Sequence, residues 1–305
     1  MAARITLPYA APAELLPAPL PTVADILAAP VLPGCVGCGV VRAGEHYAVK
    51  YGKEKKLLQE GESLLFVQQS SNVPVPRLYA LFHDDETNLN FIVQELIPGT
   101  LLSKRWRELS TPEKQDITSQ LRRHMDELRS IPSPGYYGGV WRQPIQDCLF
   151  AEGGPGGVTN QPYPDSTISG PQETEEAWTD AMWRLLNTSV SNPNALKYIS
   201  YLERPYLAVF KGHHPVFTHS DFQPVNIILR DDGQVVIIDW EKAGWYPSYW
   251  EYCTTSMADN RVNDWGHWIH KVLDEYFPEL GWMRDHRGMI LEYGNYCKEE
   301  VRGEI

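Results

Sequence analysis

Three residues between positions 219 and 239 have the types and the spacing needed to transfer a phosphoryl group. Asp221 and Asn226 lie in the run His-Ser-Asp-Phe-Gln-Pro-Val-Asn that begins at His219, and Asp239 follows further along the chain. The pattern H-x-D-x-x-x-x-N is the spacing of a phosphotransferase catalytic loop, in which the Asp accepts the proton of an attacking hydroxyl. Amide and carboxylate oxygens are ligands that suit Mg²⁺. The pattern therefore predicts Asp221 as the catalytic base, with Asn226 and Asp239 as metal ligands.

The segment between Asn226 and Asp239 predicts a β-hairpin. Two apolar runs, 227–230 and 235–238, flank the turn residues 231–234. These include an Asp-Gly pair, a strong hairpin signal because glycine adopts the positive φ of a tight turn. With a four-residue turn, the ladder places Asn226 opposite Asp239. Directly opposed residues have Cβ atoms about 4.5–5.5 Å apart, so we expect the two metal ligands to meet at the open end of the hairpin.

The motifs of this region resemble those of a known family. They are His-Ser-Asp-Phe-x-Pro-x-Asn over 219–226 and Ile-Asp-Trp-Glu-x-Ala-Gly-x-Tyr-Pro-x-Tyr-Trp-Glu-Tyr over 238–252. They resemble the aminoglycoside phosphotransferase/choline kinase-like family, in particular its uncharacterised members from filamentous fungi. The similarity runs from about Val40 to the C-terminus. It implies an α+β, bilobal, protein-kinase-like fold with a small β-rich N-lobe and a larger, mainly helical C-lobe. It also implies ATP-dependent phosphorylation of a small molecule.

Lys50 ends a β-like run and is followed by a helical pattern from Glu54 to Gln69. In a kinase-like lobe, a lysine at this place contacts the α- and β-phosphates and pairs with a glutamate of the next helix. Glu60 lies on the apolar face of the predicted helix and fits the family's alignment, so we choose it over Glu62 as the partner. The alternative for Lys50 is a solvated lysine at a strand end.

A second strand, 91–97, runs into a Pro-Gly stop at 98–99. In the resembling family this segment is the hinge between the lobes. Backbone groups near Glu95 and Ile97 would hydrogen-bond the adenine of ATP there. The alternative is an ordinary strand end.

Composition sets apart the first part of the chain, and the family resemblance implies a division of the rest into two lobes. Residues 1–33 form a Pro/Ala-rich arm, either packed on the first lobe or loosely tethered to it; 34–98 are expected to form the nucleotide-binding N-lobe, and 99–305 the catalytic and acceptor-binding C-lobe. Cys35 and Cys38 have the spacing of a metal or redox motif, but no second pair completes a zinc site. A β-turn is the favoured interpretation there.

The net charge of −12 on 305 residues bears on possible partners. It argues against nucleic acid and anionic membranes, which need Lys/Arg clusters, and it is compatible with a cationic substrate. No export signal or membrane span is recognisable. We therefore expect a monomer in the cytoplasm that acts on a small-molecule acceptor.

Three features are candidates for acceptor binding. The Gly/Pro-rich loop 150–171 is long enough to form a wall of the acceptor site. The predicted helix 172–187 carries several acids, which either receive a cation or form a solvated face. The aromatic run 245–252 either cages an ammonium group or packs beneath the catalytic loop, and packing is favoured.

These patterns together predict a Mg²⁺- and ATP-dependent kinase that phosphorylates a hydroxyl of a small molecule, for example of an aminoglycoside or an amino alcohol. One alternative is a catalytically inactive nucleotide-binding scaffold. A protein kinase is disfavoured because no Ala-Pro-Glu follows Asp239, and because Ser220 stands where protein kinases have the Arg of His-Arg-Asp. His219 is expected to brace the loop.

Overall fold

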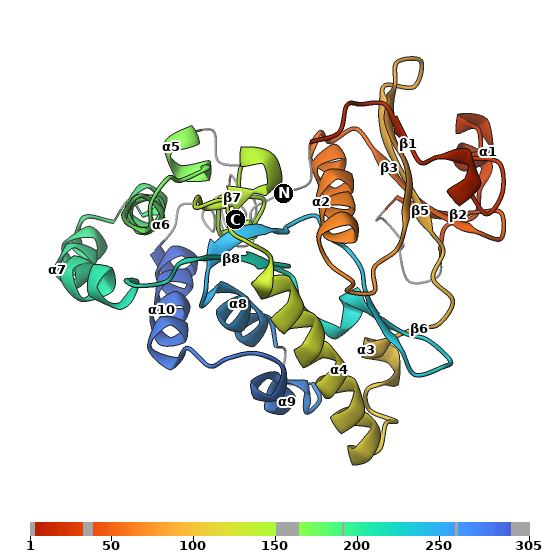
Figure 1. The fold of residues 1–305 in the computed structure, drawn as a ribbon. Helices are drawn as coiled ribbons and strands as arrows, with labels where there is room; N and C mark the ends of the chain where they lie inside the picture. Colours follow the sequence, from red (N-terminus) through yellow and green to blue (C-terminus); the bar gives the residue numbers. More distant parts are fainter. Residues whose placement is uncertain (1–3, 33–38, 151–164, 191, 260–261, 294–305) are drawn as a thin grey trace, which may run out of the picture. The chain divides into compact units, whose positions relative to one another are not determined.

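A computed structural model describes residues 4–32, 39–150, 165–190, 192–259 and 262–293 (Figure 1). Contacts within the chain define two compact units. The first comprises Met1–Leu128 and Gln223–Glu241, and the second Arg129–Phe222 and Lys242–Ile305. The expected division into an arm and two lobes stays a prediction. Cys35 and Cys38 lie outside the described residues.

The first unit is built on a five-stranded antiparallel sheet in the order β1-β4-β5-β3-β2. Its strands are β1 (Tyr9–Ala10), β2 (Val40–Ala43), β3 (Tyr47–Gly52), β4 (Leu78–Asp84) and β5 (Leu89–Glu95). Helix α2 (Lys56–Ser70) packs against β3, β4 and β5. The close approach of α2 to β4 requires Gly61, because a Cβ atom at this position would collide with the side chain of Leu81 on β4. This packing fixes α2 against the strand that carries Lys50.

The N-terminal arm packs on the sheet and is not loosely tethered to it. It supplies β1, the short 3₁₀ helix Ala13–Leu15 and helix α1 (Val23–Ala28). Thr22 and Asp25 form the capping box that begins α1. Ile26 of α1 is fully buried among the strand residues of the core.

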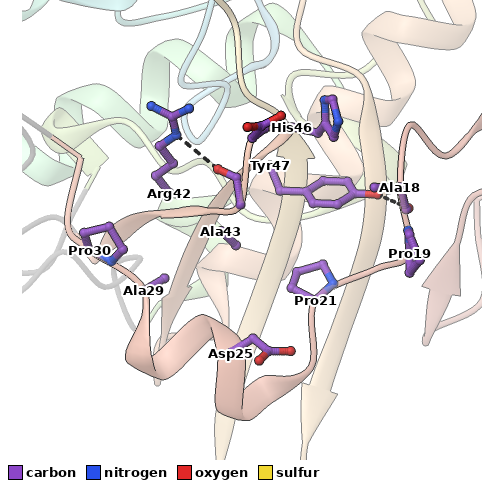
Figure 2. Close-up of a pocket in the computed structure, with 12 residues that line it drawn as sticks. Ala18, Pro19, Pro21, Asp25, Ala29, Pro30, Arg42, Ala43, His46 and Tyr47 are labelled. Carbon is purple, nitrogen blue, oxygen red and sulfur yellow. Dashed lines mark hydrogen bonds between the residues drawn. The ribbon is translucent and has the colours of Figure 1, made fainter.

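A hollow of 390 Å³ remains where the arm passes the β2–β3 hairpin (Figure 2). Prolines of the arm and polar residues of the hairpin line it, and the phenol of Tyr47 closes one side by donating a hydrogen bond to the carbonyl of Ala18. None of the residues predicted to do chemistry lines this hollow.

The first unit also contains a smaller sheet in the order β10-β9-β6. Its strands are β6 (Thr100–Leu101), β9 (Ile227–Leu229) and β10 (Val235–Ile237), with β9 and β10 drawn in cyan in Figure 1. Helix α3 (Leu102–Arg105) and the 3₁₀ turn Pro224–Asn226 contact each other beside it, and helix α4 (Thr111–Ser130) leads into the second unit. The Glu113 carboxylate accepts from the backbone N–H of Ser110 at 2.7 Å and so caps the start of α4.

The second unit has a three-stranded sheet in the order β7-β11-β8 and is otherwise mainly helical. The strands are β7 (Gly138–Gly139), β8 (Pro215–Thr218) and β11 (Gly244–Pro247). The helices are α5 (Ser166–Ser169), α6 (Glu175–Ser189), α7 (Pro193–Val209), α8 (Trp250–Ala258), α9 (Trp265–Val272) and α10 (Phe277–Tyr293), with 3₁₀ turns at Val140–Arg142 and Cys148–Phe150. Among the parts of the chain that the structure describes, no helix has both the length and the apolar character needed to cross a bilayer.

Candidate active site

The predicted hairpin forms, but its turn is one residue shorter than expected. The backbone N–H of Arg230 donates to the carbonyl of Gln234 at 2.9 Å, so the loop consists of 231–233. Gly233 has a φ of +83° and closes this loop. A three-residue loop that ends on a left-handed glycine is one of the common hairpin connections.

The shorter turn moves the register at the open end of the hairpin. Asn226 now faces Ile238, whose N–H donates to the Asn226 carbonyl at 3.0 Å. The expected direct facing of Asn226 and Asp239 is therefore wrong, because the glycine turn closes the ladder one residue earlier. The choice of these two residues as metal ligands depends on the motif alone and stays a prediction.

Lys50 is held between two carboxylates within the first unit. Its Nζ lies 2.6 Å from Oε1 of Glu60, on α2, and 2.7 Å from Oδ1 of Asp239, just beyond β10. Glu60 is thus the partner on α2, whereas the carboxylate of Glu62 accepts from Arg4 at 2.8 Å. The alternative of a solvated lysine is wrong, since the Lys50 side chain is only 16% exposed.

The charge of Lys50 follows from these neighbours. Burial alone would lower the pKa of its amine. The carboxylates of Glu60 and Asp239 outweigh burial and raise the pKa above its ordinary value. Lys50 is therefore a cation on β3 at neutral pH. Asp239 itself has a φ of +67°, a conformation that a non-glycine residue rarely adopts and that often marks a functional position.

A third carboxylate joins this group. Oxygen atoms of Glu60, Asp239 and Glu241 all lie within 4.8 Å of one another. Such a set of hard oxygen donors fits Mg²⁺, which binds through one or two carboxylates together with substrate phosphates. Lys56 lies 3.3 Å from Glu241 and offsets part of the negative charge. Glu241 was not among the predicted ligands, although it occupies the third position of the Asp-Trp-Glu motif.

The predicted hinge residues lie where β5 ends. The N–H of Glu95 donates to the carbonyl of Arg77 at 2.8 Å, and that of Leu96 donates to the carbonyl of His46 at 2.9 Å. Both donors are therefore engaged within the sheet. Ile97 comes directly after this bonded stretch, and the roles of backbone groups near Glu95 and Ile97 in binding adenine stay predictions.

In the second unit, Glu251 holds the backbone of the loop that carries Asp221. This glutamate lies at the start of α8, and its carboxylate accepts from the N–H groups of His219 at 2.6 Å and Ser220 at 3.0 Å. Burial raises the pKa of Glu251 to about 7, and the two backbone donors partly oppose that shift. The sequence motif includes Glu251 but gives no sign of this role.

Ser220 sits in a strained conformation that buried side chains support. Its φ is +66°, and strain of this kind costs about 1–3 kcal/mol. The hydroxyl of Ser220 donates to Oδ2 of Asp147 at 2.8 Å and accepts from Nε1 of Trp250 at 2.9 Å. The N–H of Asp221 donates to Nδ1 of His219 at 3.2 Å, in line with the bracing role expected for this histidine. The peptide between Ser220 and Asp221 is thus held by the side-chain contacts of Ser220 and by the hydrogen bond from the Asp221 N–H to His219.

Asp221 keeps its carboxylate partly open to solvent, with 29% of the side chain exposed. Its Oδ2 lies 3.1 Å from Nζ of Lys242. Sequence reasoning missed this lysine, because the contact joins two loops that are separated by the whole hairpin.

The acids predicted on the helix after residue 172 are engaged within the protein. The carboxylate of Glu175 accepts from the N–H groups of Gly212 at 2.7 Å and His213 at 2.5 Å. Glu173 forms an ion pair with Arg142. These two acids have protein partners instead of the proposed substrate cation. Most of the predicted acceptor loop, 151–164, lies outside the described residues.

The aromatic run after Asp239 is packed in the core. Trp245, Tyr246, Tyr249, Trp250 and Tyr252 are each at most 6% exposed. An ammonium cage needs a face through which the cation enters. The favoured interpretation, packing beneath the catalytic loop, is confirmed, and the cage is excluded.

The fold recurs in solved structures. Aminoglycoside phosphotransferase APH(2'')-Ib with ADP bound matches with a TM-score of 0.56 and 18% identity, covering 86% of this chain and 85% of that one. The GDP and kanamycin complex of APH(2")-IIia matches with a TM-score of 0.50 and 14% identity, covering 83% and 78%. Choline kinase LicA from Streptococcus pneumoniae matches with a TM-score of 0.49 and 14% identity, covering 87% and 82%. The first match confirms the predicted α+β, protein-kinase-like fold class.

The sequence itself identifies the family. No curated protein matches the chain in sequence. A family model described as the phosphotransferase enzyme family does match, over residues 42–286. This match confirms the resemblance of the motifs to this family and the predicted enzyme class, a phosphotransferase, whereas the likeness to fungal members stays a prediction. Since the matched region covers most of its 305 residues, the chain belongs to the phosphotransferase enzyme family.

Proposed function

We propose that this protein is a small-molecule kinase that uses ATP and Mg²⁺ to phosphorylate a hydroxyl group. The observation that carries the proposal is the Lys50 ammonium, held at 2.6 Å from Glu60 and 2.7 Å from Asp239. In kinases, the lysine that contacts the nucleotide phosphates is held by an ion pair with a glutamate of the following helix. The place of Lys50 on a strand followed by a packed helix is the kinase arrangement.

The first unit would hold the nucleotide. Lys50 would donate to the α- and β-phosphates, and Glu60 would keep its ammonium in place. Asp239, with Asn226 and Glu241, would hold Mg²⁺, and the ion would neutralise negative charge on the nucleotide phosphates. Backbone groups near Glu95 and Ile97 would hydrogen-bond the adenine.

The second unit would supply the base. Asp221 would accept the proton of the acceptor's hydroxyl while that oxygen forms a bond to the γ-phosphorus and the bond between the γ-phosphorus and the leaving oxygen of ADP breaks. The fixed peptide around Ser220 would keep the carboxylate in position, so that positioning and charge neutralisation provide most of the rate enhancement.

The similar structures support a nucleotide and a small acceptor. One contains ADP, and another contains GDP and kanamycin. For the acceptor of this chain we propose a hydroxyl-bearing small molecule, which includes cationic compounds such as aminoglycosides and amino alcohols. Action as a monomer in the cytoplasm, without nucleic acid or membrane, belongs to the same proposal. The alternative is an inactive nucleotide-binding scaffold.

An acceptor screen separates the two functions. Wild-type protein with Mg·ATP is offered kanamycin, choline and D-glucose, with related compounds of each class, and the release of ADP is followed. Asp221→Asn serves as the control for contaminating kinases. The proposal predicts ADP release that requires an acceptor and is lost in the variant. Tight binding of Mg·ATP without transfer to any acceptor would instead establish the scaffold.

A further inference from the structure

Lys242 lies beside the proposed base because two antiparallel strands end at the same place. Strands β8 and β11 pair so that Thr218 faces Gly244. The chain that leaves β8 soon reaches Asp221, and the chain that enters β11 comes from Lys242. The register of this small sheet thus brings the two side chains together, with Nζ 3.1 Å from Oδ2.

The backbone of Lys242 is anchored, whereas its side chain reaches the surface. The carbonyl of Lys242 accepts from the hydroxyl of Tyr246 at 2.8 Å. Tyr246 is fully buried and stacks on Trp250, with ring centroids 5.4 Å apart. The Lys242 side chain is 21% exposed and that of Asp221 is 29% exposed. A ligand can therefore approach both groups.

The ion pair between Lys242 and Asp221 contributes little to the stability of the fold. Pairs that are partly exposed contribute about 0–1 kcal/mol to folding. The same contact has a larger effect on orientation, because a charge-assisted hydrogen bond to one oxygen fixes the rotation of a carboxylate. The Asp221 backbone is already fixed through His219, so Lys242 adds the restraint on the side chain itself.

We propose that Lys242 is a positioning residue for phosphoryl transfer: its ammonium holds the carboxylate of Asp221 in the orientation that receives the acceptor's proton. This inference rests on the function proposed above for Asp221. Misplacing a reacting group by 1 Å can cost about 10²-fold in rate. Loss of the ammonium should therefore lower kcat and leave nucleotide binding unchanged.

The test uses Lys242→Met, which keeps the length of the side chain and removes its charge, and Lys242→Arg, which keeps a cationic donor. The activity is ADP release from Mg·ATP with the best acceptor among kanamycin, choline and D-glucose. We expect kcat to fall about 10–100-fold in Lys242→Met, with an unchanged KM for ATP. In Lys242→Arg most of kcat should return. Lys271→Met, on the exposed face of α9, is the matched control and should behave as wild type.

A double variant distinguishes positioning from a general structural defect. If Lys242 acts through Asp221, Lys242→Met should reduce kcat little further in the Asp221→Asn background. Losses that multiply in the double variant, or a wild-type kcat in Lys242→Met, would overturn the inference while the kinase function stands. Wild-type protein that transfers phosphate to no acceptor contradicts the proposed function and this role together. Circular dichroism and the melting midpoint verify that each variant folds, with Lys242→Gln as the substitute if Lys242→Met does not.

Discussion

At the scale of single residues, Asp239 contacts the ammonium of Lys50 and is also proposed to bind the metal ion. Asp239→Ala removes a hard oxygen ligand and one of the two carboxylates that orient Lys50. We expect the affinity for Mg·ATP, measured by calorimetry, to fall more than about tenfold, which corresponds to ~1.4 kcal/mol. Asp85→Ala, at a fully exposed turn position, is the matched control. Equal affinities in wild type and Asp239→Ala would remove Asp239 from the nucleotide site.

Glu251 makes a pH-dependent contribution to stability. Its pKa in the folded protein is about 7, above the value of about 4.3 for an unperturbed glutamate. The folded protein therefore binds this proton more tightly than the unfolded chain, and the contribution is complete below pH 4 and lost as the pH rises through 7. Between pH 5 and pH 7, wild type should lose about 2 kcal/mol more unfolding free energy than Glu251→Gln. Urea unfolding at both pH values measures this difference, and parallel pH profiles would contradict it.

At the scale of elements, the arm holds helix α2 through one ion pair. Arg4 lies on the arm and binds both carboxylate oxygens of Glu62, at 2.8 and 3.2 Å, and Glu62 is 3% exposed. Arg4→Ala takes the guanidinium away from a buried carboxylate, so we expect unfolding free energy to fall by about 1–3 kcal/mol. Arg4→Ala with Glu62→Gln should recover most of that loss, because no buried charge remains.

The exposed pair between Arg105 and Glu108 is the control for the arm. Their side chains are 46% and 71% exposed, so Arg105→Ala should cost less than about 1 kcal/mol. Denaturant unfolding of wild type, Arg4→Ala, the Arg4→Ala/Glu62→Gln double variant and Arg105→Ala measures these differences in unfolding free energy. If Arg4→Ala and Arg105→Ala have the same small effect, the arm does not secure α2.

The elements also show what the sequence could predict. The pairing of Lys50 with Glu60 was predictable, since helical spacing places Glu60 on the inner face of α2 and the family resemblance favours it over Glu62. The hairpin was predictable from its apolar runs, but its register was not, because the length of the turn depends on how Gly233 closes it. The contacts of Asp221 with Lys242 and of Ser220 with Glu251 depend on how β8, β11 and α8 pack. Residue spacing contains no information on that packing.

At the scale of the whole molecule, the chain divides the proposed chemistry between its two compact units. Asn226 and Asp239 belong to the first unit, whereas Asp221 and Lys242 belong to the second. The predicted metal ligands and the predicted base are therefore parts of different compact units. Substitutions at the base are expected to spare nucleotide binding for this reason.

The net charge of −12 predicts how salt affects different acceptors. An acidic surface attracts cations over distances that shrink from about 30 Å at 0.01 M salt to about 10 Å at 0.1 M. Over this range we expect kcat/KM to fall about threefold or more for kanamycin and to stay constant for the uncharged D-glucose. Initial rates in both salt concentrations provide the measurement. The same salt dependence for both acceptors would exclude steering by the protein's charge.

The most direct test of the proposed kinase is to measure turnover and nucleotide affinity together in Asp221→Asn. The variant keeps the size of the side chain and a hydrogen-bond acceptor, so the loop held by Glu251 and His219 should fold as before. It loses the charge that we propose orients the hydroxyl and receives its proton. With the best acceptor from the screen, we expect kcat to fall by about 10²–10⁴ while the Kd for Mg·ATP changes several-fold at most. A variant that retains more than half of the wild-type kcat would show that Asp221 is not the base.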